Sequence, residues 1–88
     1  MDTNVKEKVL EFFKSKGEVP GRTENEQLAY NYLDANFIHS IEIVEMIVVF
    51  EEEFHIHFKP QHMLSSDFCS IGGLVALITQ LIGEKTRA

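Results

Sequence analysis

Apolar residues recur at helical spacing in three separate segments of this chain, and this periodicity limits the folds open to it. The segments cover residues 3–16, about 39–54 and 70–83. In each, the apolar side chains fall on one side of a helix, because residues three or four apart are neighbours on its surface. The first and last segments are expected to end at Gly17 and Gly83, which suit the left-handed end of a helix. Three helices that each bury one face predict an all-α bundle.

The segments between these helices are shorter or less periodic. Residues 17–37 form a long first loop, and the spaced aromatic residues in it are expected to pack back onto the core. Residues 54–58 alternate apolar and polar side chains but stop before Pro60, which predicts an extended connector. Residues 61–68 are expected to form a short helical piece. The expected fold is therefore a four-helix bundle with three longer helices, one short helix and a long first loop.

Composition indicates one soluble domain. The chain has 88 residues, of which 44% are hydrophobic and two are prolines, so residues 1–88 are expected to form a single domain with one core. The single cysteine, Cys69, excludes an internal disulfide and is interpreted as a core residue. The N-terminus lacks the pattern of a secretory signal, and the longest uncharged run, residues 68–83, is too short to span a bilayer. We expect a cytoplasmic protein that does not enter membranes, and nothing in the sequence requires more than a monomer.

Acidic residues are concentrated in the middle of the chain. The net charge is −6, from 14 acidic and eight basic residues. Residues 23–58 hold eight of the acidic residues and no lysine or arginine, so this segment carries −8 and the remainder carries +2. This distribution argues against binding to nucleic acid or to an anionic membrane, and it favours a basic protein partner.

The sequence shows no convincing catalytic or metal-binding set of residues. His39 and Ser40 are adjacent, and adjacent residues on a helix do not face each other, so the imidazole is poorly aimed for a hydrolase dyad. His55, His57 and His62 lie close together in the sequence, near three glutamates. These histidines can be interpreted as ligands of a zinc or nickel ion. The alternative is that they are polar side chains that point outward from the connector. No second motif supports a metal, so we predict neither a catalytic site nor a metal site.

The segment from His39 to Phe54 resembles the acyl carrier protein family. It reads His-Ser-Ile-Glu-Ile-Val-Glu-Met-Ile-Val-Val-Phe-Glu-Glu-Glu-Phe. The family pattern is Asp-Ser-Leu, an acidic residue, an apolar pair, Glu, four or five apolar residues, Glu-Glu-Glu and Phe, and each element is in register except the first. The resemblance extends over nearly the whole chain through the order of the expected helices and loops. Residues 32–38 also look like the loop before the serine in stand-alone specialised carriers.

The resemblance implies a carrier without catalysis of its own. Ser40 would carry 4′-phosphopantetheine, transferred from coenzyme A by a magnesium-dependent phosphopantetheinyl transferase. Acyl or aminoacyl groups, as in fatty acid biosynthesis, would be held as thioesters on the terminal sulfur of this arm. A physical argument agrees, because the N-terminus of a helix favours a phosphate group.

His39 is the departure from the family pattern. It stands where the family has an aspartate that caps the helix, adds negative charge there and takes part in recognition by the transferase. Three consequences are open: a dedicated or tolerant transferase, weak modification of Ser40, or a carrier-like interaction module that lacks the arm and binds a basic partner.

The resemblance also implies a docking surface on the helix that follows Ser40. In the family this helix binds basic patches on partner enzymes that transfer or condense acyl groups. The residues expected to contact partners are Glu42, Val44, Glu45, Val48, Glu51 and Glu52. A solvated acidic face is the alternative interpretation of these glutamates. Ile47, Phe50 and Leu74 are expected either to contact a folded-back acyl chain or to belong to the core.

Overall fold

The computed structural model describes residues 2–33 and 35–87, and the side chains of residues 5–33 and 35–84. Within these residues the regular structure is entirely helical, which confirms the expected all-α class. The elements are α1 (Asp2–Lys16), α2 (Glu24–Ala29), α3 (Ser40–Phe54), α4 (Pro60–Met63), the 3₁₀ turn η1 (Ser66–Cys69) and α5 (Ile71–Arg87). The described part of the chain contains no helix with the length and apolar character needed to cross a membrane.

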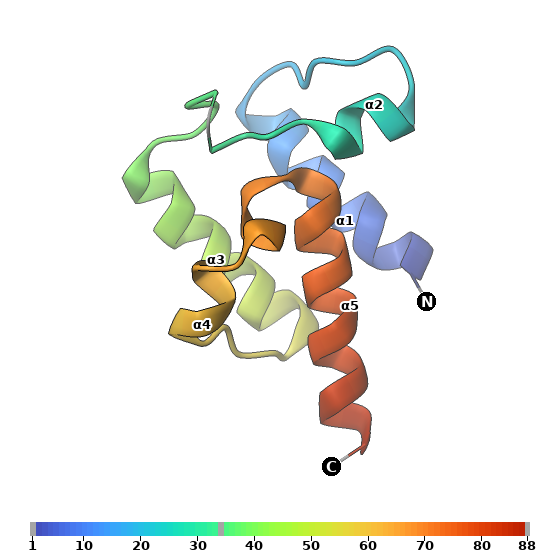
Figure 1. Cartoon of the computed structure of the whole chain (residues 1–88), viewed down its shortest axis with the longest axis vertical. Coiled ribbons are helices and arrows are strands. Elements are labelled where there is room, and N and C mark those ends of the chain that lie inside the picture. The colour runs from blue at the N-terminus through green and yellow to red at the C-terminus, as the bar shows by residue number, and fades with distance from the viewer. Residues whose placement is uncertain (1, 34, 88) are drawn as a thin grey trace.

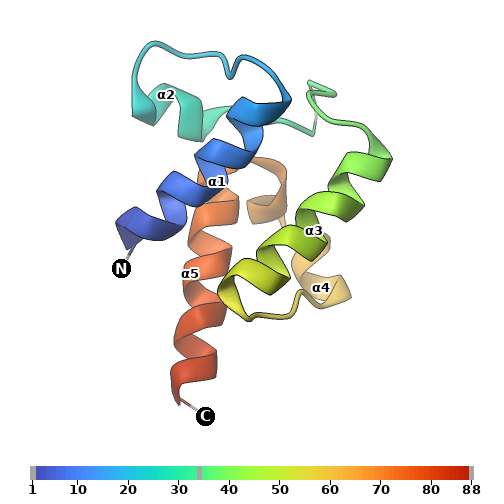
Figure 2. The same cartoon turned by 180° about the vertical axis from the view of Figure 1, so that it is seen from behind.

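Helix α5 forms the central support of the bundle. It runs along the long axis of the molecule, and α1 crosses it on one side (Figure 1). Helices α1 and α2 and the turn η1 all lie against α5, whereas α3 comes less close to the other backbones. Seen from behind, α1 and α3 both lie in front of α5 (Figure 2). Helices α1 and α3 run in opposite directions. Lys8, in the first half of α1, pairs with Glu53 near the end of α3, whereas Lys16, at the end of α1, pairs with Glu45 in the first half of α3.

The three long helices supply most of the fully buried side chains. Their apolar stripes meet at the centre, as their helical spacing predicts. The completely buried members are Val9 and Phe13 of α1, Met46 and Phe50 of α3, and Ile71, Leu74 and Ile78 of α5. Aromatic contacts join α1 to α3, since the ring centroids of Phe12 and Phe50 lie 5.4 Å apart. Long side chains, rather than close backbone approach, therefore hold α3 in the bundle.

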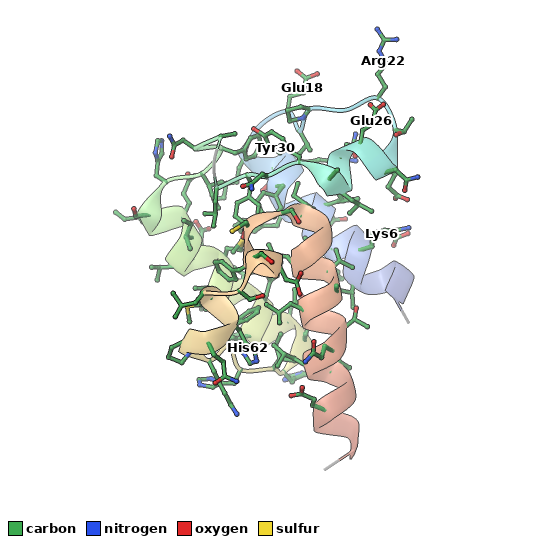
Figure 3. The ribbon with its side chains drawn as sticks, in the orientation of Figure 1. Lys6, Glu18, Arg22, Glu26, Tyr30 and His62 are labelled. Atoms are coloured by element: carbon green, nitrogen blue, oxygen red, sulfur yellow. The ribbon has the colours of Figure 1, made fainter. Side chains whose placement is uncertain are left out.

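The long first loop packs back onto the core, as predicted, but it also contains a helix that was not predicted. Helix α2 begins after Thr23, whose hydroxyl accepts a hydrogen bond from the Glu26 N–H at 3.2 Å. The side chains of Glu18 and Arg22, in the same connection, point away from the bundle (Figure 3). The loop is anchored further along the chain, where the backbone oxygen of Tyr30 accepts from the Ile71 N–H at 3.2 Å.

Tyr32 is the innermost residue of this loop. Its side chain is 0% exposed and packs against Phe13, with ring centroids 4.7 Å apart. Its hydroxyl donates a hydrogen bond to the backbone carbonyl of Phe68 in η1. Burial, with a smaller contribution from nearby Cys69, raises the pKa of Tyr32 well above its usual value, so the hydroxyl remains a donor at neutral pH. Cys69 itself is only partly buried, which makes it less of a core residue than expected.

We expect Tyr32→Phe to lower the free energy of unfolding by about 1 to 2 kcal/mol, because it leaves the Phe68 carbonyl without its donor. Urea unfolding followed by circular dichroism measures this change. Tyr30→Phe is the matched control, since Tyr30 is only half-buried and its hydroxyl has no hydrogen-bond partner among the described residues. Equal stability of the two variants would contradict the assigned role of the Tyr32 hydroxyl.

Two expected helix ends differ from the structure. Helix α1 ends at Lys16 as predicted, but Gly17 does not adopt the left-handed conformation, which among the described glycines only Gly21 shows. Helix α5 continues through Gly83 to Arg87, so the predicted end at Gly83 is wrong. A glycine within a helix costs only about 1 kcal/mol, and the residues that follow Gly83 favour helix enough to continue it. The predicted short piece at residues 61–68 is divided into α4 and η1.

Candidate functional site

Ser40 is the first residue of α3, and its side chain is exposed. His39 precedes the helix in an extended conformation, and its carbonyl accepts the N–H of Ile43 at 3.0 Å. The Glu42 carboxylate accepts the backbone N–H of His39 at 2.9 Å, the reverse half of a capping box. These two bonds fix the start of the helix. The Ser40 hydroxyl therefore faces solvent at the positive end of a 15-residue helix.

The solvent-facing side of α3 combines aliphatic and acidic side chains. At about 100° per residue, five residues fall within one sector that lies opposite the buried Phe50. These residues, which we call the α3 outer face, are Ile41, Val44, Glu45, Val48 and Glu52. Ile41 is 83% exposed, Val44 62% and Val48 46%. Aliphatic side chains exposed in a row are typical of a surface that binds another molecule.

Among the residues predicted to contact partners, Val44, Glu45, Val48 and Glu52 belong to the α3 outer face. Glu42 lies to one side of it, toward α1, and is engaged in the helix cap. Glu51 lies to the other side. Its carboxylate accepts the Phe58 N–H at 2.9 Å, and its Oε2 lies 3.4 Å from Nδ1 of His57. Glu51 thus ties the connector after α3 to the helix, which is a structural role that the sequence did not suggest.

Four exposed apolar side chains were not predicted from the sequence: Ile41, Val49, Met63 and Leu64. Ile41 was not among the residues predicted to contact partners, although its rotation about the helix axis places it between Val44 and Glu45. At the end of α4, Leu64 is 87% exposed and Met63 is also exposed. No periodic pattern marks a four-residue helix, so the sequence held no clear signal for these two residues.

The histidines do not form a shared site. His55 ends α3 in the left-handed conformation, and His57 is exposed beside Glu51, as expected for outward positions in the connector. His62 lies on α4 (Figure 3), where its Nδ1 accepts the Lys59 N–H at 3.0 Å. In the described residues, no three His, Cys, Asp or Glu side chains are placed to hold a metal ion. His39 lies at the other end of α3, and in this part of the chain no hydrogen bond joins the Ser40 hydroxyl to a base.

A groove of about 310 Å³ lies between α1 and α3, and its lining includes Phe12, Val49 and Phe50. Phe50 and Leu74, two of the three residues weighed for contact with an acyl chain, are completely buried, and Ile47 is half-buried. Phe50 and Leu74 therefore belong to the core, and Ile47 packs at its edge.

Comparison of the chain with protein-family models, with curated proteins and with solved structures gave no match. Two features of the chain itself therefore bear on function: the exposed Ser40 at the start of α3 and the α3 outer face beside it.

Proposed function

We propose that the chain is an acyl carrier protein, with 4′-phosphopantetheine attached to Ser40. The observation that carries this proposal is the position of Ser40, exposed at the N-terminus of α3 and adjacent to the α3 outer face. We also infer that the helices form a carrier-type bundle, in which α1, α3 and α5 are the long helices and α4 is the short one. Helix α2 would then be part of the long first loop.

The start of α3 fits the phosphodiester that links such an arm to a protein. The Ser40 hydroxyl is open to solvent, so a transferase has access to it. A phosphate on this oxygen would lie next to the free N–H groups of the first helical turn, where the helix dipole stabilises negative charge. Glu42 opposes this to a limited extent, because its carboxylate is held near the same end. No residue of the chain is required to activate the hydroxyl.

Attachment would proceed by phosphoryl transfer. The Ser40 oxygen forms a bond to the β-phosphorus of coenzyme A, the bond between that phosphorus and the 3′,5′-ADP portion breaks, and the transferase takes up the serine proton. The arm, once attached, supplies a thiol that holds acyl or aminoacyl groups as thioesters. This chain then contributes the attachment point and the surface by which partner enzymes recognise it.

The α3 outer face would provide that recognition. Its carboxylates suit basic patches on acyl-transferring or condensing enzymes, and its aliphatic side chains add contact area that does not depend on salt. We expect the protein to act as a cytoplasmic monomer that meets these enzymes in turn.

Modification of Ser40 is the direct test. The purified chain is incubated with a phosphopantetheinyl transferase of broad specificity, magnesium and coenzyme A, and the intact mass is measured. We expect the mass to increase by one phosphopantetheine group in the wild type and in Ser66→Ala, and not in Ser40→Ala. Ser66 is the matched control because it is another exposed serine at the start of a helical element.

His39→Asp separates carrier function from the second candidate, an interaction module without the arm. That candidate is favoured by one observation, namely that the α3 outer face exists independently of Ser40. If wild type and His39→Asp both remain unmodified by several transferases, and protein from its own host carries no adduct, the carrier proposal is wrong. If modification is slow in the wild type and faster in His39→Asp, the histidine limits recognition by the transferase used.

A further inference from the structure

Lys16, the last residue of α1, contacts the acidic residues at the start of α3. Its Nζ lies 3.0 Å from Oε1 of Glu45 and 3.9 Å from Oε2 of Glu42. The same Nζ lies 5.4 Å from the centroid of the Phe12 ring. The Lys16 side chain is 21% exposed, so the stem is largely covered while the ammonium group reaches the two carboxylates. Lys16 therefore occupies the place where a cation from another protein would bind Glu45.

The carboxylates of Glu45 and Glu52 on the α3 outer face, and of Glu42 beside it, differ in how far nearby groups compensate their charge. Glu45 is bonded to Lys16, and Glu42 lies between Lys16 and the His39 N–H. Glu52 is exposed and has no ion pair among the described residues. A partner that approaches this face meets one free carboxylate, one that is already paired, and a row of uncovered aliphatic side chains.

We propose that Lys16 acts as an intramolecular competitor that weakens the binding of basic partners to the α3 outer face. This inference rests on the proposed function, in which that face is the docking surface. A partner cation that binds Glu45 must first displace Lys16, which the fold holds in place and which therefore competes at a high effective concentration. The loss applies to every partner that uses Glu45. A partner that also covers Ile41, Val44 and Val48 offsets this loss through apolar contact.

The partner surface that fits is accordingly amphipathic and basic. A partner surface with positive charge alone would be attracted less strongly, because Lys16 already compensates Glu45. Salt would weaken its binding further. A surface that places apolar side chains beside one or two lysines or arginines retains the apolar contribution. Lys16 thus weakens the binding of a merely basic protein, whereas a protein with apolar side chains beside its cations still gains contact with the aliphatic residues of the face.

The test compares Lys16→Met with Lys8→Met. Lys8 is the matched control, because it lies on the same helix and pairs with one α3 carboxylate, Glu53, at 3.1 Å. Methionine keeps the apolar stem over Phe12 and removes the charge. The probe is a fluorescein-labelled amphipathic helical peptide of leucine and lysine, and its affinity is measured by fluorescence anisotropy. We expect Lys16→Met to bind the peptide about two to five times more tightly than Lys8→Met, the gain from removing one exposed ion pair.

Two further measurements complete the design. Lys16→Arg keeps the cation and should bind the peptide no more tightly than the wild type. In the wild type, the NMR signals of the Lys16 Hε protons should shift toward those of free lysine as peptide is added, while the Lys8 signals remain unchanged. This second readout does not depend on the stability of any variant.

Equal affinity of Lys16→Met and Lys8→Met for the peptide, or unchanged Lys16 signals when peptide binds, would overturn the competitor role. Neither result depends on the arm, since the peptide is tested with unmodified protein. If Lys16→Met strengthens peptide binding but Ser40 is never modified, the competitor role holds and the carrier function is wrong. If Ser40 is modified but Lys16→Met has no effect, the carrier function holds and the competitor role is wrong.

Discussion

Replacing Gly73 with alanine is expected to lower the free energy of unfolding by about 3 kcal/mol, the upper part of the usual range for overpacking. A Cβ atom at position 73 would lie 2.8 Å from the Cα of Asp67 and closer still to the Asp67 carbonyl oxygen. These are backbone atoms, which cannot rotate away as the end of a side chain can. The turn η1 and helix α5 would have to separate. That movement would also disturb Phe68, which is buried and accepts the Tyr32 hydrogen bond.

Gly83→Ala is the matched control, because it makes the same change in the same helix. A Cβ at position 83 meets nothing within 4 Å, and the residue is exposed. We expect this variant to be more stable than the wild type by about 0.5 to 1 kcal/mol, the difference in helix propensity between alanine and glycine. Urea unfolding monitored by circular dichroism measures both variants. If Gly73→Ala unfolds at the same urea concentration as Gly83→Ala, η1 does not lie against α5 as described.

The three long helices were predictable because each extends over four or more turns with a continuous apolar stripe. Helix α2 was not, because it has six residues and none of them is buried. A local signal was nevertheless present. Thr23 and Glu26 have the spacing of a capping box, and both side chains accept backbone N–H groups at the start of α2. Short helices on a bundle surface are better sought by their caps than by their periodicity.

At the candidate site, the sequence predicted features that lie within one helix, but not contacts between residues that are far apart in the chain. The position of Ser40 near a helix start follows from the apolar spacing of one segment, and Val44 and Val48 were named as partner contacts through the resemblance to the carrier family. The pairing of Lys16 with Glu45 joins residues 29 positions apart and depends on how α1 packs against α3. The hydrogen bond that the Phe58 N–H donates to the Glu51 carboxylate depends on the left-handed turn at His55. Periodicity carries no information on either arrangement.

Reversing two charges on the α3 outer face is expected to reduce partner binding by about 100-fold, because like charges that face each other across an interface cost several kcal/mol. The structure selects Glu45→Lys with Glu52→Lys as the double variant. Among the described residues, Glu52 has no ion pair, and Glu45 forms an ion pair only with Lys16. Glu42 is unsuitable, since its carboxylate also accepts the His39 N–H, and its loss would weaken the helix start that presents Ser40. Changing Glu42 would confound docking with folding.

The measurement is kcat/KM for modification of Ser40 by the transferase, with the leucine and lysine peptide as a second ligand. The control double variant is Glu7→Lys with Glu18→Lys, which changes the net charge equally at exposed positions outside α3. A general electrostatic attraction would weaken by similar factors in both double variants. If instead the α3 outer face is the docking surface, the Glu45 and Glu52 variant loses binding while the control stays within a few-fold of the wild type. Equal losses in the two variants would mean that partners respond to the overall negative charge of the protein, and the exposed aliphatic row on α3 would then need another explanation.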